Sequence, residues 1–300
     1  MLIFDLHYIG WRAFHSMGHL KTSEDVAFGL ILGALQQIYS LSAQFKDERP
    51  VVFACDSPIS KRKEICPSYK ATRETVSEGT EQEQAARIEA LTQIIKLKTE
   101  VLPKLGFKNV FQYEGYEADD IIAALAFKQH RPLIITNDDD LLQLLNFSRV
   151  YSPTRKMIFD KEWFMREKGI PPSHWPSVKA IAGCSSDNVK GVRGVGESTA
   201  LKWLLHKLKP GKKASDIEAF IVSEEFELNV RLVTLPFDYL FNPTVHPNEF
   251  SIEGFREVCE QYEFQQLASQ EKEWAATFAE RKQVSFRRTG AGTNKQGFDI

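Results

Sequence analysis

Three short apolar segments of the chain each lead into aspartate: 2–4 before Asp5, 51–55 before Asp56, and 133–136 just before Asp138 and Asp140. Short apolar segments of this kind are typical of the buried strands of a parallel sheet. In an open parallel sheet the ligand crevice lies outside the carboxyl ends of the strands, so these acidic side chains should converge there. The sequence therefore predicts a cluster of carboxylates at one edge of a sheet.

The segment 115–120, Gly-Tyr-Glu-Ala-Asp-Asp, adds three carboxylates at the start of an apolar, helix-like stretch at 121–127. Magnesium prefers oxygen ligands and leaves positions for substrate phosphates, so the predicted cofactor is a pair of Mg²⁺ ions, for which Mn²⁺ can substitute. Two such ions can catalyse in-line hydrolysis of a phosphodiester. The residues that carry this interpretation are Asp5, Asp56, Glu117, Asp119, Asp120, Asp138 and Asp140.

A simpler interpretation is that each acidic residue only caps a helix, because carboxylates are favoured near positive helix ends. For any one residue this simpler interpretation is the stronger one. It does not account for the whole set, because carboxylates gathered so closely would repel one another unless cations neutralised them. A metal site explains them jointly.

A second motif, Pro-Ser-Tyr-Lys-Ala-Thr-Arg at 67–73, follows the strand that ends near Asp56. Lys70 and Arg73 are three residues apart and would share a helical face. Lysine and arginine side chains both bind phosphate, and the ring of Tyr69 could stack on a base. The alternative is a solvated basic surface, but the position just after Asp56 favours phosphate binding.

A third motif is the glycine-rich segment 187–196, which leads into a helix-like segment at 197–203. Its backbone amides and the helix dipole make an anion site, and Lys190, Arg193 and Lys202 add charge for a nucleic-acid backbone. The Rossmann fingerprint does not fit, because Thr199 replaces the final glycine and no strand is expected just before the loop. An ordinary glycine-rich turn remains the alternative.

The order of apolar segments predicts an α/β fold with a parallel sheet flanked by helices. Helices are expected at 26–41, 84–102 and 141–145, and a strand at 109–113. Residues 150–159 should form a hairpin, and Asp160 should cap a helix that Gly169 ends. The later part should be mostly helical, including 216–228 and 253–282, followed by a polar tail that cannot fold alone.

Composition narrows the class of protein. A formal charge of −2 over 300 residues argues against a uniformly basic nucleic-acid binder, although the acidic cluster offsets basic residues elsewhere. A hydrophobic content of 43% is ample for a buried core. The four cysteines form no C-x-x-C pair, so neither a zinc knuckle nor a disulfide framework is expected. We expect a cytoplasmic chain with neither export nor membrane insertion, because no apolar run is long enough to span a bilayer.

Taken together, these motifs resemble the structure-specific 5′ nuclease family, which includes the 5′ nuclease domains of bacterial DNA polymerase I, phage 5′ exonucleases and flap endonucleases. The resemblance runs from Met1 to about Tyr239. Its most specific parts are 115–123, 136–145 and 186–202, supported by 11–15 and 67–70. The family fold is a PIN-like parallel sheet with flanking helices, a helical arch over the site, and a helix-three-turn-helix that binds duplex DNA.

The resemblance implies cleavage of DNA, and of RNA hybridised to DNA, near a 5′ end or at a 5′ flap, with two magnesium ions. It places Asp5, Asp56, Glu117 and Asp119 at the first metal, and Asp120, Asp138, Asp140 and Asp187 nearer the second. Lys70 and Arg73 would contact the scissile phosphate. Substrate contacts are implied for Arg12, His15, Tyr69, Lys190, Gly191, Arg193, Gly194, Gly196 and Lys202, and carbonyls at Val192 and Val195 could hold K⁺.

On this resemblance, a nuclease domain spans 1–175, with an arch at about 60–102. A duplex-binding and helical region spans 176–282, and a flexible tail spans 283–300. The length is that of a stand-alone, monomeric phage or bacterial enzyme that removes primers or flaps, with replication proteins as candidate partners.

Two positions depart from the family pattern. Cys184 stands where bacterial and phage members have aspartate, which removes one ligand of the second metal, and Leu6 stands where bacterial members usually have glycine. The substitution at Cys184 leaves open a binding protein with weakened catalysis. A metal-dependent ribonuclease for single-stranded RNA is a further alternative, against which the arch and the helix-three-turn-helix count.

Overall fold

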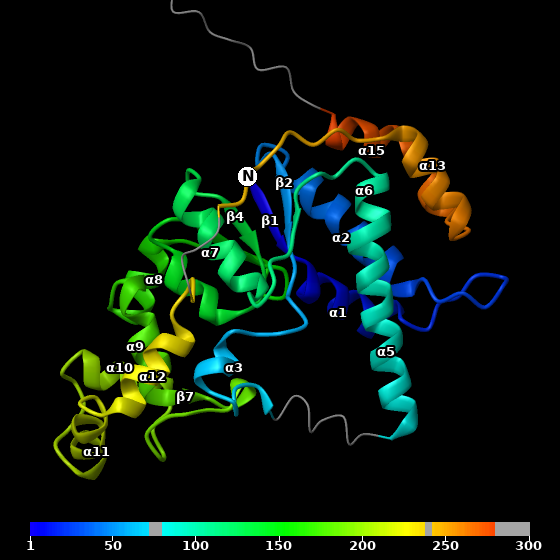
Figure 1. Cartoon of the computed structure of the whole chain (residues 1–300). Helices are drawn as coiled ribbons and strands as arrows, with labels where there is room; N and C mark the ends of the chain where they lie inside the picture. The colour runs from blue at the N-terminus through cyan, green and yellow to red at the C-terminus, as the bar shows by residue number, and fades with distance from the viewer. Residues whose placement is uncertain (72–79, 238–241, 280–300) are drawn as a thin grey trace, which may run out of the picture.

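The computed structural model describes residues 1–71, 80–237 and 242–279 of the chain. A six-stranded sheet lies at its centre, in the order β3-β2-β1-β4-β5-β6 (Figure 1). The strands are β1 (Leu2–Asp5), β2 (Val51–Ala54), β3 (Val110–Phe111), β4 (Leu133–Ile135), β5 (Arg149–Ser152) and β6 (Met157–Phe159). All neighbours are parallel except β5 and β6, which form an antiparallel hairpin. The predicted α/β class and the predicted hairpin are both confirmed.

The buried strands send alternate side chains to two different cores. Phe4 stacks on Phe53 at 5.6 Å between ring centroids, on the first face of the sheet. Ile3 and Val52 belong to the core on the second face. Because both faces are covered, these strands are apolar throughout, which explains why their sequences show no polar alternation.

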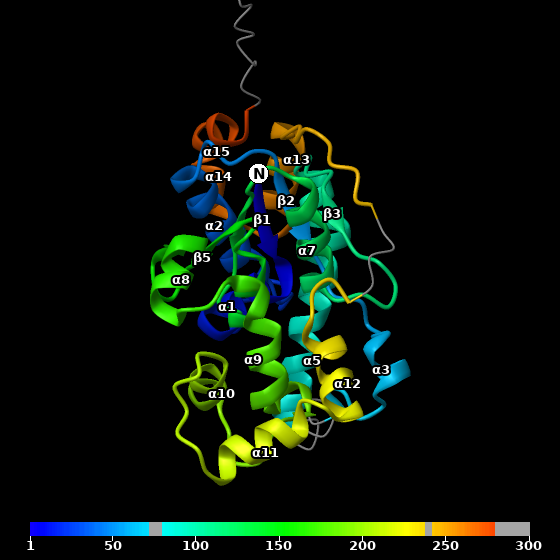
Figure 2. The ribbon, with the colours of Figure 1, turned by 90° about the vertical axis from the view of Figure 1, so that its left-hand side faces the viewer.

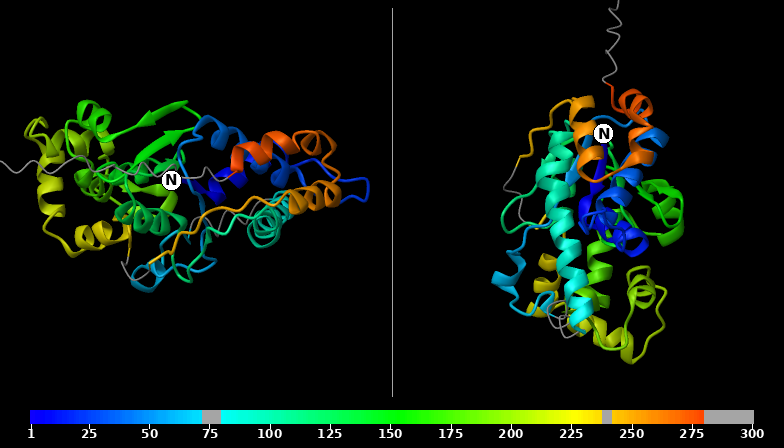
Figure 3. Two further views of the ribbon diagram at one scale, coloured as in Figure 1. Left: turned by 90° about the horizontal axis from the view of Figure 1, so that it is seen from above. Right: turned by 90° about the vertical axis from the view of Figure 1, so that its right-hand side faces the viewer.

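Helices from both ends of the described chain cover the first face. They are α1 (Leu6–Met17), α2 (Gly29–Gln44), α5 (Glu81–Lys96), a π-helical turn (Leu97–Val101), α6 (Leu102–Lys104), α13 (Ile252–Gln261), α14 (Gln265–Ala268) and α15 (Glu271–Phe278). Helices α1 and α2 pack closely because Gly33 has no side chain; a Cβ there would lie 2.9 Å from the Cβ of Ala13. Figure 3 shows α5 along one side of the molecule, with α13 and α15 near the N-terminus.

The second face is covered by elements from the middle of the chain: α7 (Ala118–Lys128), η3 (Asp139–Leu144), α8 (Lys161–Lys168), η4 (Pro172–His174) and α9 (Trp175–Ala182). Asp160 caps α8 by accepting a hydrogen bond from Trp163 N, and Gly169 ends it with a φ of 73°. Both positions agree with the predicted start and end of this helix.

The remaining elements lie beyond the carboxyl ends of the strands. They are α3 (Arg62–Ile65), β7 (Gly183–Cys184), η5 (Ser185–Asp187), β8 (Val189–Lys190), α10 (Glu197–Leu204), α11 (Lys212–Phe220) and α12 (Glu224–Val233). In Figure 2, α9, α12 and α3 extend below the sheet together with the lower part of α5. The strand ends that carry the acidic residues therefore face these helices.

Several predicted elements differ in detail from the structure. Helix α1 was not expected at all, and the single helix predicted at 216–228 is two helices, because Ser223 starts α12 by accepting from Phe226 N. The helix predicted at 141–145 is the 3₁₀ segment η3. The domain limits stay predictions, and the tail at 283–300 lies outside the described residues. No helix among the described residues has the length and apolar character to cross a bilayer.

Candidate active site

Acidic side chains from the strand ends and from α7 line one cavity of about 330 Å³. Asp5 ends β1, Asp56 follows β2 and Asp138 follows β4, so three neighbouring strands deliver one carboxylate each. The full acidic lining is Asp5, Asp56, Glu117, Asp119, Asp138, Asp140 and Asp187. The predicted convergence at the sheet edge is thus present in the fold.

Local hydrogen bonds hold several of these carboxylates in place. Asp5 Oδ1 accepts from Tyr8 N at 3.0 Å and so starts α1, while Asp138 Oδ1 accepts from Asp140 N at 2.8 Å. Asp56 Oδ1 accepts from Ala118 N, the first residue of α7, at 2.8 Å. The helix-capping interpretation is therefore correct for these residues, and the same bonds orient them into the shared cavity.

The crowding of negative charge shifts the ionisation of the cluster. Burial and the neighbouring Asp56 raise the pKa of Asp5 to about 7. Burial and Asp138 raise the pKa of Asp119 well above its usual range, and they raise that of Asp140 to about 6. Each of these carboxyls would release its proton more readily beside a cation, and the donors here are mainly oxygen. The residues therefore fit a site for hard divalent cations such as magnesium.

Glu117 differs from the other acids because donors and cations surround it. Lys70 Nζ lies 2.7 Å from Glu117 Oε2, Tyr69 Oη donates to the same oxygen at 3.2 Å, and Ser60 Oγ donates to Oε1 at 3.2 Å. Burial opposes ionisation of Glu117, but Lys70 and Arg62 together outweigh it and lower its pKa. Glu117 is thus ionised and already paired with protein cations.

The backbone at Lys70 is described, whereas that of Arg73 is not. Lys70 has a φ of 54°, in the left-handed region, and the helical face that it was predicted to share with Arg73 stays a prediction. Its backbone N donates to Asp187 O at 2.9 Å, and Asn188 Nδ2 donates to Ser68 O at 2.8 Å. These bonds tie the segment after α3 to η5. Arg73 lies outside the described residues.

A second part of the site lies around η5. Three residues, Asp140, Cys184 and Asp187, each place one possible ligand atom within 4.8 Å of the other two, a spacing suited to a metal ion. Lys179, which sequence reasoning missed, pairs with Asp140 at 2.7 Å and with Glu197 at 2.9 Å. Lys179 is the single charged residue of α9, and this was the signal that could have found it.

The glycine-rich segment forms a compact hairpin and loop before α10. Strands β7 and β8 pair, and Gly191 packs so tightly that a Cβ would lie 2.3 Å from Gly183 N. Lys190, Arg193 and Lys202 are all exposed. Gly194 and Gly196 have open space around them, while Val195 is buried and its N–H donates to Val192 O at 3.0 Å.

The predicted substrate residues of α1 lie on its exposed side. Arg12 is exposed, and its Nη1 donates to Gln37 Oε1 at 2.7 Å. His15 is exposed beside Trp11, with 6.2 Å between ring centroids. Both side chains are accessible from solvent, and their contact with nucleic acid stays a prediction.

The contacts of two further predicted residues are mainly with the protein itself. Tyr69 is 3% exposed and belongs to a small apolar cluster with Val189 and Leu232, and its stacking on a base stays a prediction. Asp120 is fully buried and does not line the acidic cavity. Both of its oxygens bind the guanidinium of Arg62, so Asp120 is the partner of a buried arginine, and its role as a metal ligand stays a prediction.

His7 also lines the cavity and was missed from the sequence. Its Nδ1 accepts a hydrogen bond from Asp56 N at 3.2 Å, and burial lowers the pKa of His7. The imidazole is therefore neutral near pH 7 and helps to place the backbone of Asp56. Its position two residues after Asp5, at the start of a helix, was the available signal.

The fold and this acidic cavity define a class of protein. A family model described as the 5′-3′ exonuclease, N-terminal resolvase-like domain, matches residues 1–169. The chain therefore belongs to the 5′-3′ exonuclease family, whose members are metal-dependent nucleases, and the resemblance read from the sequence motifs is confirmed.

Among curated relatives, the chain is 30% identical over 287 residues to the thermostable DNA polymerase I of Thermus thermophilus, covering 89% of this chain and 32% of that protein. It is 31% identical over 218 residues to DNA polymerase I of Mycobacterium tuberculosis, covering 68% of this chain and 22% of that protein. The chain thus spans about a third or less of the length of these relatives.

Two solved structures share the fold. The zinc-bound T5 5′-exonuclease has a TM-score of 0.67 at 21% identity, covering 93% of this chain and 99% of that one. Flap endonuclease-1 from Methanococcus jannaschii has a TM-score of 0.60 at 12% identity, covering 93% and 92%.

Proposed function

We propose that this chain is a structure-specific 5′ nuclease that hydrolyses phosphodiester bonds of DNA near 5′ ends and at 5′ flaps. One observation carries the proposal: seven carboxylates from five segments of the chain line one cavity, and Lys70 lies at its border. Family membership supports the same reaction class. RNA hybridised to DNA is a second substrate, and removal of primers or flaps during replication is the proposed task.

Magnesium is the proposed cofactor. Asp5, Asp56, Glu117 and Asp119 would hold one ion, and Asp138, Asp140 and Asp187 would hold a second beside Cys184. When bound, such ions supply Lewis-acid chemistry for the attacking water and the leaving oxygen.

The chain's own cations would bind and orient the substrate. Lys70 pairs with Glu117, which caps α7, and on the proposal it contacts the scissile phosphate together with Arg73. The exposed Lys190, Arg193 and Lys202 are suited to the backbone of duplex DNA, and the amides of Gly191, Gly194 and Gly196 to its phosphates. Carbonyls at Val192 and Val195 are candidate ligands for K⁺.

The test is cleavage of an end-labelled DNA with a 5′ flap, in magnesium, manganese or chelator, by the wild-type protein and by Asp138→Asn. We expect metal-dependent cuts near the flap junction that fall by about a hundredfold or more in the variant, because a charge-stabilising group is lost from the reacting centre. Tight binding without cutting under any metal would instead favour the binding-only alternative. Cutting of single-stranded RNA without duplex binding would favour the ribonuclease alternative.

A further inference from the structure

Arg62, on the short helix α3, is an unusual arginine because it is only 2% exposed. Arginine side chains are almost never this deeply buried unless they are paired. Arg62 borders the acidic cavity, yet its guanidinium is directed to protein partners that the proposed reaction does not require. The question is what this buried cation does for the site.

The guanidinium of Arg62 binds two other segments of the chain. Its Nη1 and Nη2 donate to Asp120 Oδ2 and Oδ1 at 2.7 and 2.8 Å, which is a bidentate pair. Its Nε donates to Leu232 O at 2.9 Å, in the last turn of α12. Its Cζ also lies 4.8 Å from the ring centroid of Phe237. One side chain therefore joins α3, α7 and the end of α12.

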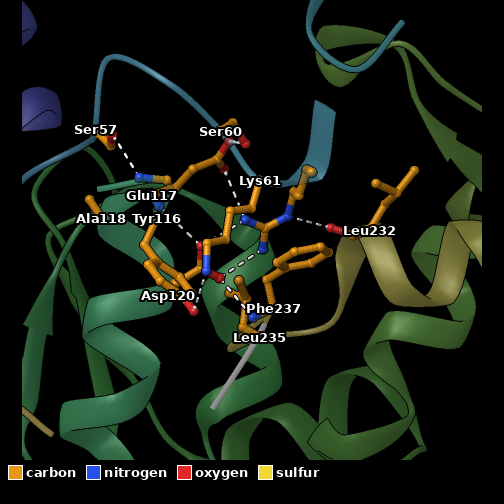
Figure 4. Close-up of polar contacts among 12 residues, drawn as sticks. Ser57, Ser60, Lys61, Tyr116, Glu117, Ala118, Asp120, Leu232, Leu235 and Phe237 are labelled. Carbon is orange, nitrogen blue, oxygen red and sulfur yellow. Dashed lines mark hydrogen bonds and ion pairs between the residues drawn. The ribbon is translucent and has the colours of Figure 1, made fainter. Parts of the chain in front are cut away.

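Asp120 extends the same network through its remaining acceptor positions. Asp120 Oδ2 accepts from Glu117 N at 3.0 Å, and Asp120 Oδ1 accepts from Phe237 N at 2.9 Å. Figure 4 shows Asp120 between the start of α7, where Glu117 lies, and Phe237. Both oxygens of a fully buried carboxylate are thus used by partners of fixed geometry.

The network reaches the catalytic cavity at Glu117. Arg62 Nη1 lies 3.6 Å from Glu117 Oε2, the oxygen that Lys70 approaches to 2.7 Å. Glu117 is therefore held through its backbone by Asp120 and faces Arg62 and Lys70 through its side chain. A shift of Arg62 would therefore move the side chains of Glu117 and Lys70 with it.

We propose that Arg62, with Asp120 as its counterion, is a positioning residue that fixes Glu117 and Lys70 relative to the remaining carboxylates. The inference rests on the proposed nuclease function. A buried ion pair of this kind need not stabilise the fold, because the cost of removing both charges from water can exceed their attraction. Positioning of Glu117 and Lys70 gives the pair a role beyond stability. Arginine is needed because a lysine keeps the charge but cannot make the planar bidentate bond together with the bond to Leu232 O.

The first test compares Arg62→Lys and Asp120→Asn with Arg256→Lys. Arg256 makes a similar two-bond pair with Glu271 among the C-terminal helices, so it controls for loss of such a pair outside the site. Assayed on the 5′-flap DNA well below each variant's melting temperature, the two site variants should lower kcat by about tenfold or more, because small misplacements at a reacting centre are costly. KM for DNA should stay within about twofold. Arg256→Lys should leave both unchanged.

The second test separates positioning from general weakening of the fold. If Arg62 acts through Lys70 and Glu117, Arg62→Lys should cost clearly less when added to Lys70→Ala than it costs alone, because the two changes remove part of one shared function. Losses that multiply in the double variant would overturn the proposal. So would a raised KM with an unchanged kcat.

A third readout does not depend on cleavage. Binding of Mn²⁺ alone, followed by electron paramagnetic resonance, should weaken in Arg62→Lys because Glu117 is a proposed ligand, and should be unchanged in Arg256→Lys. If the wild-type protein cuts no flap, the proposed function fails, and this measurement still decides the positioning role. Equal Mn²⁺ affinity in wild type and Arg62→Lys would refute it. If Arg62→Lys does not fold, Asp120→Asn carries the same comparisons.

Discussion

At the scale of single residues, the site pairs its acids with lysines at two places. Lys70 forms an ion pair with Glu117, and Lys179 forms one with Asp140, so each of these carboxylates has a protein cation beside it. Burial opposes the charge of Lys179, but Asp140 and Glu197 raise its pKa above the usual range. A metal ion entering either position has to share or displace a cation that is already present.

Lys70→Ala should slow cleavage far more than it weakens binding of duplex DNA, if Lys70 stabilises charge that develops in the reaction. We expect a fall in kcat of about a hundredfold, the scale of one lost charge-stabilising donor, with little change in duplex affinity. Single-turnover cleavage and fluorescence anisotropy measure the two quantities. Lys272→Ala, on α15, is the control, and equal losses in rate and affinity would make Lys70 a binding residue only.

Cys184→Asp should restore a carboxylate where the family pattern has one. Cys184, Asp140 and Asp187 place their ligand atoms close enough together to bind one metal ion. Burial raises the pKa of the Cys184 thiol, which disfavours the thiolate needed for metal binding. We expect the magnesium concentration for half-maximal cleavage to fall by roughly tenfold, a usual scale for changes around a metal site. Manganese tolerates varied ligands better than magnesium, so we expect manganese to support faster cleavage by the wild-type protein and this difference to shrink in Cys184→Asp. Cys66→Ser is the control thiol, and an unchanged metal dependence would refute the hypothesis.

At the scale of elements, the hairpin of β7 and β8 depends on close backbone contact. Gly191→Ala places a methyl group 2.3 Å from Gly183 N, so the hairpin has to shift. We expect a loss of stability of about 1–3 kcal/mol, typical of overpacking, together with weaker duplex binding. Urea unfolding and anisotropy measure both. Gly196→Ala meets nothing within 4 Å and should leave the free energy of unfolding nearly unchanged, and equal losses of stability in the two variants would contradict this account.

Elements with local signals could be predicted from the sequence. Strands β1, β2 and β4 were predicted from apolar runs that lead into aspartate, and α8 from Asp160 and Gly169. Helix α1 was missed, although Asp5 caps it and helix capping was the alternative interpretation of this residue. The roles of Arg62 and Tyr69 were out of reach, since they depend on partners such as Leu232 that lie more than a hundred and fifty residues away.

At the scale of the whole molecule, the acidic cluster makes stability depend on pH. Burial and Asp56 raise the pKa of Asp5 to about 7, so the folded chain holds a proton that the unfolded chain releases at lower pH. Such a group stabilises the fold at low pH, and that stability is lost as pH rises through about 7. The raised pKa values of Asp119 and Asp140 act in the same direction.

In chelator, the thermal midpoint of the wild-type protein should therefore fall relative to that of Asp5→Asn as pH rises from about 5 to about 7.5. Differential scanning calorimetry of the two proteins measures the difference. His7, whose pKa burial lowers, is present in both proteins and affects both curves. Magnesium should recover the wild-type midpoint at the higher pH. Parallel curves for the two proteins would show that Asp5 does not titrate as described.

The path of the chain has a consequence for the newly made protein. β1 lies in the middle of the sheet, but Trp274 and Phe278 complete the core on its first face. Phe53, Phe107 and Phe278 form a continuous run of ring contacts, with centroids 5.4 and 5.0 Å apart. A chain still on the ribosome therefore lacks part of the cover of its central strand, beside that from α1, α2 and α5, until residue 278 has emerged. The sheet whose strand ends gather the carboxylates would therefore be incompletely packed until that point in synthesis.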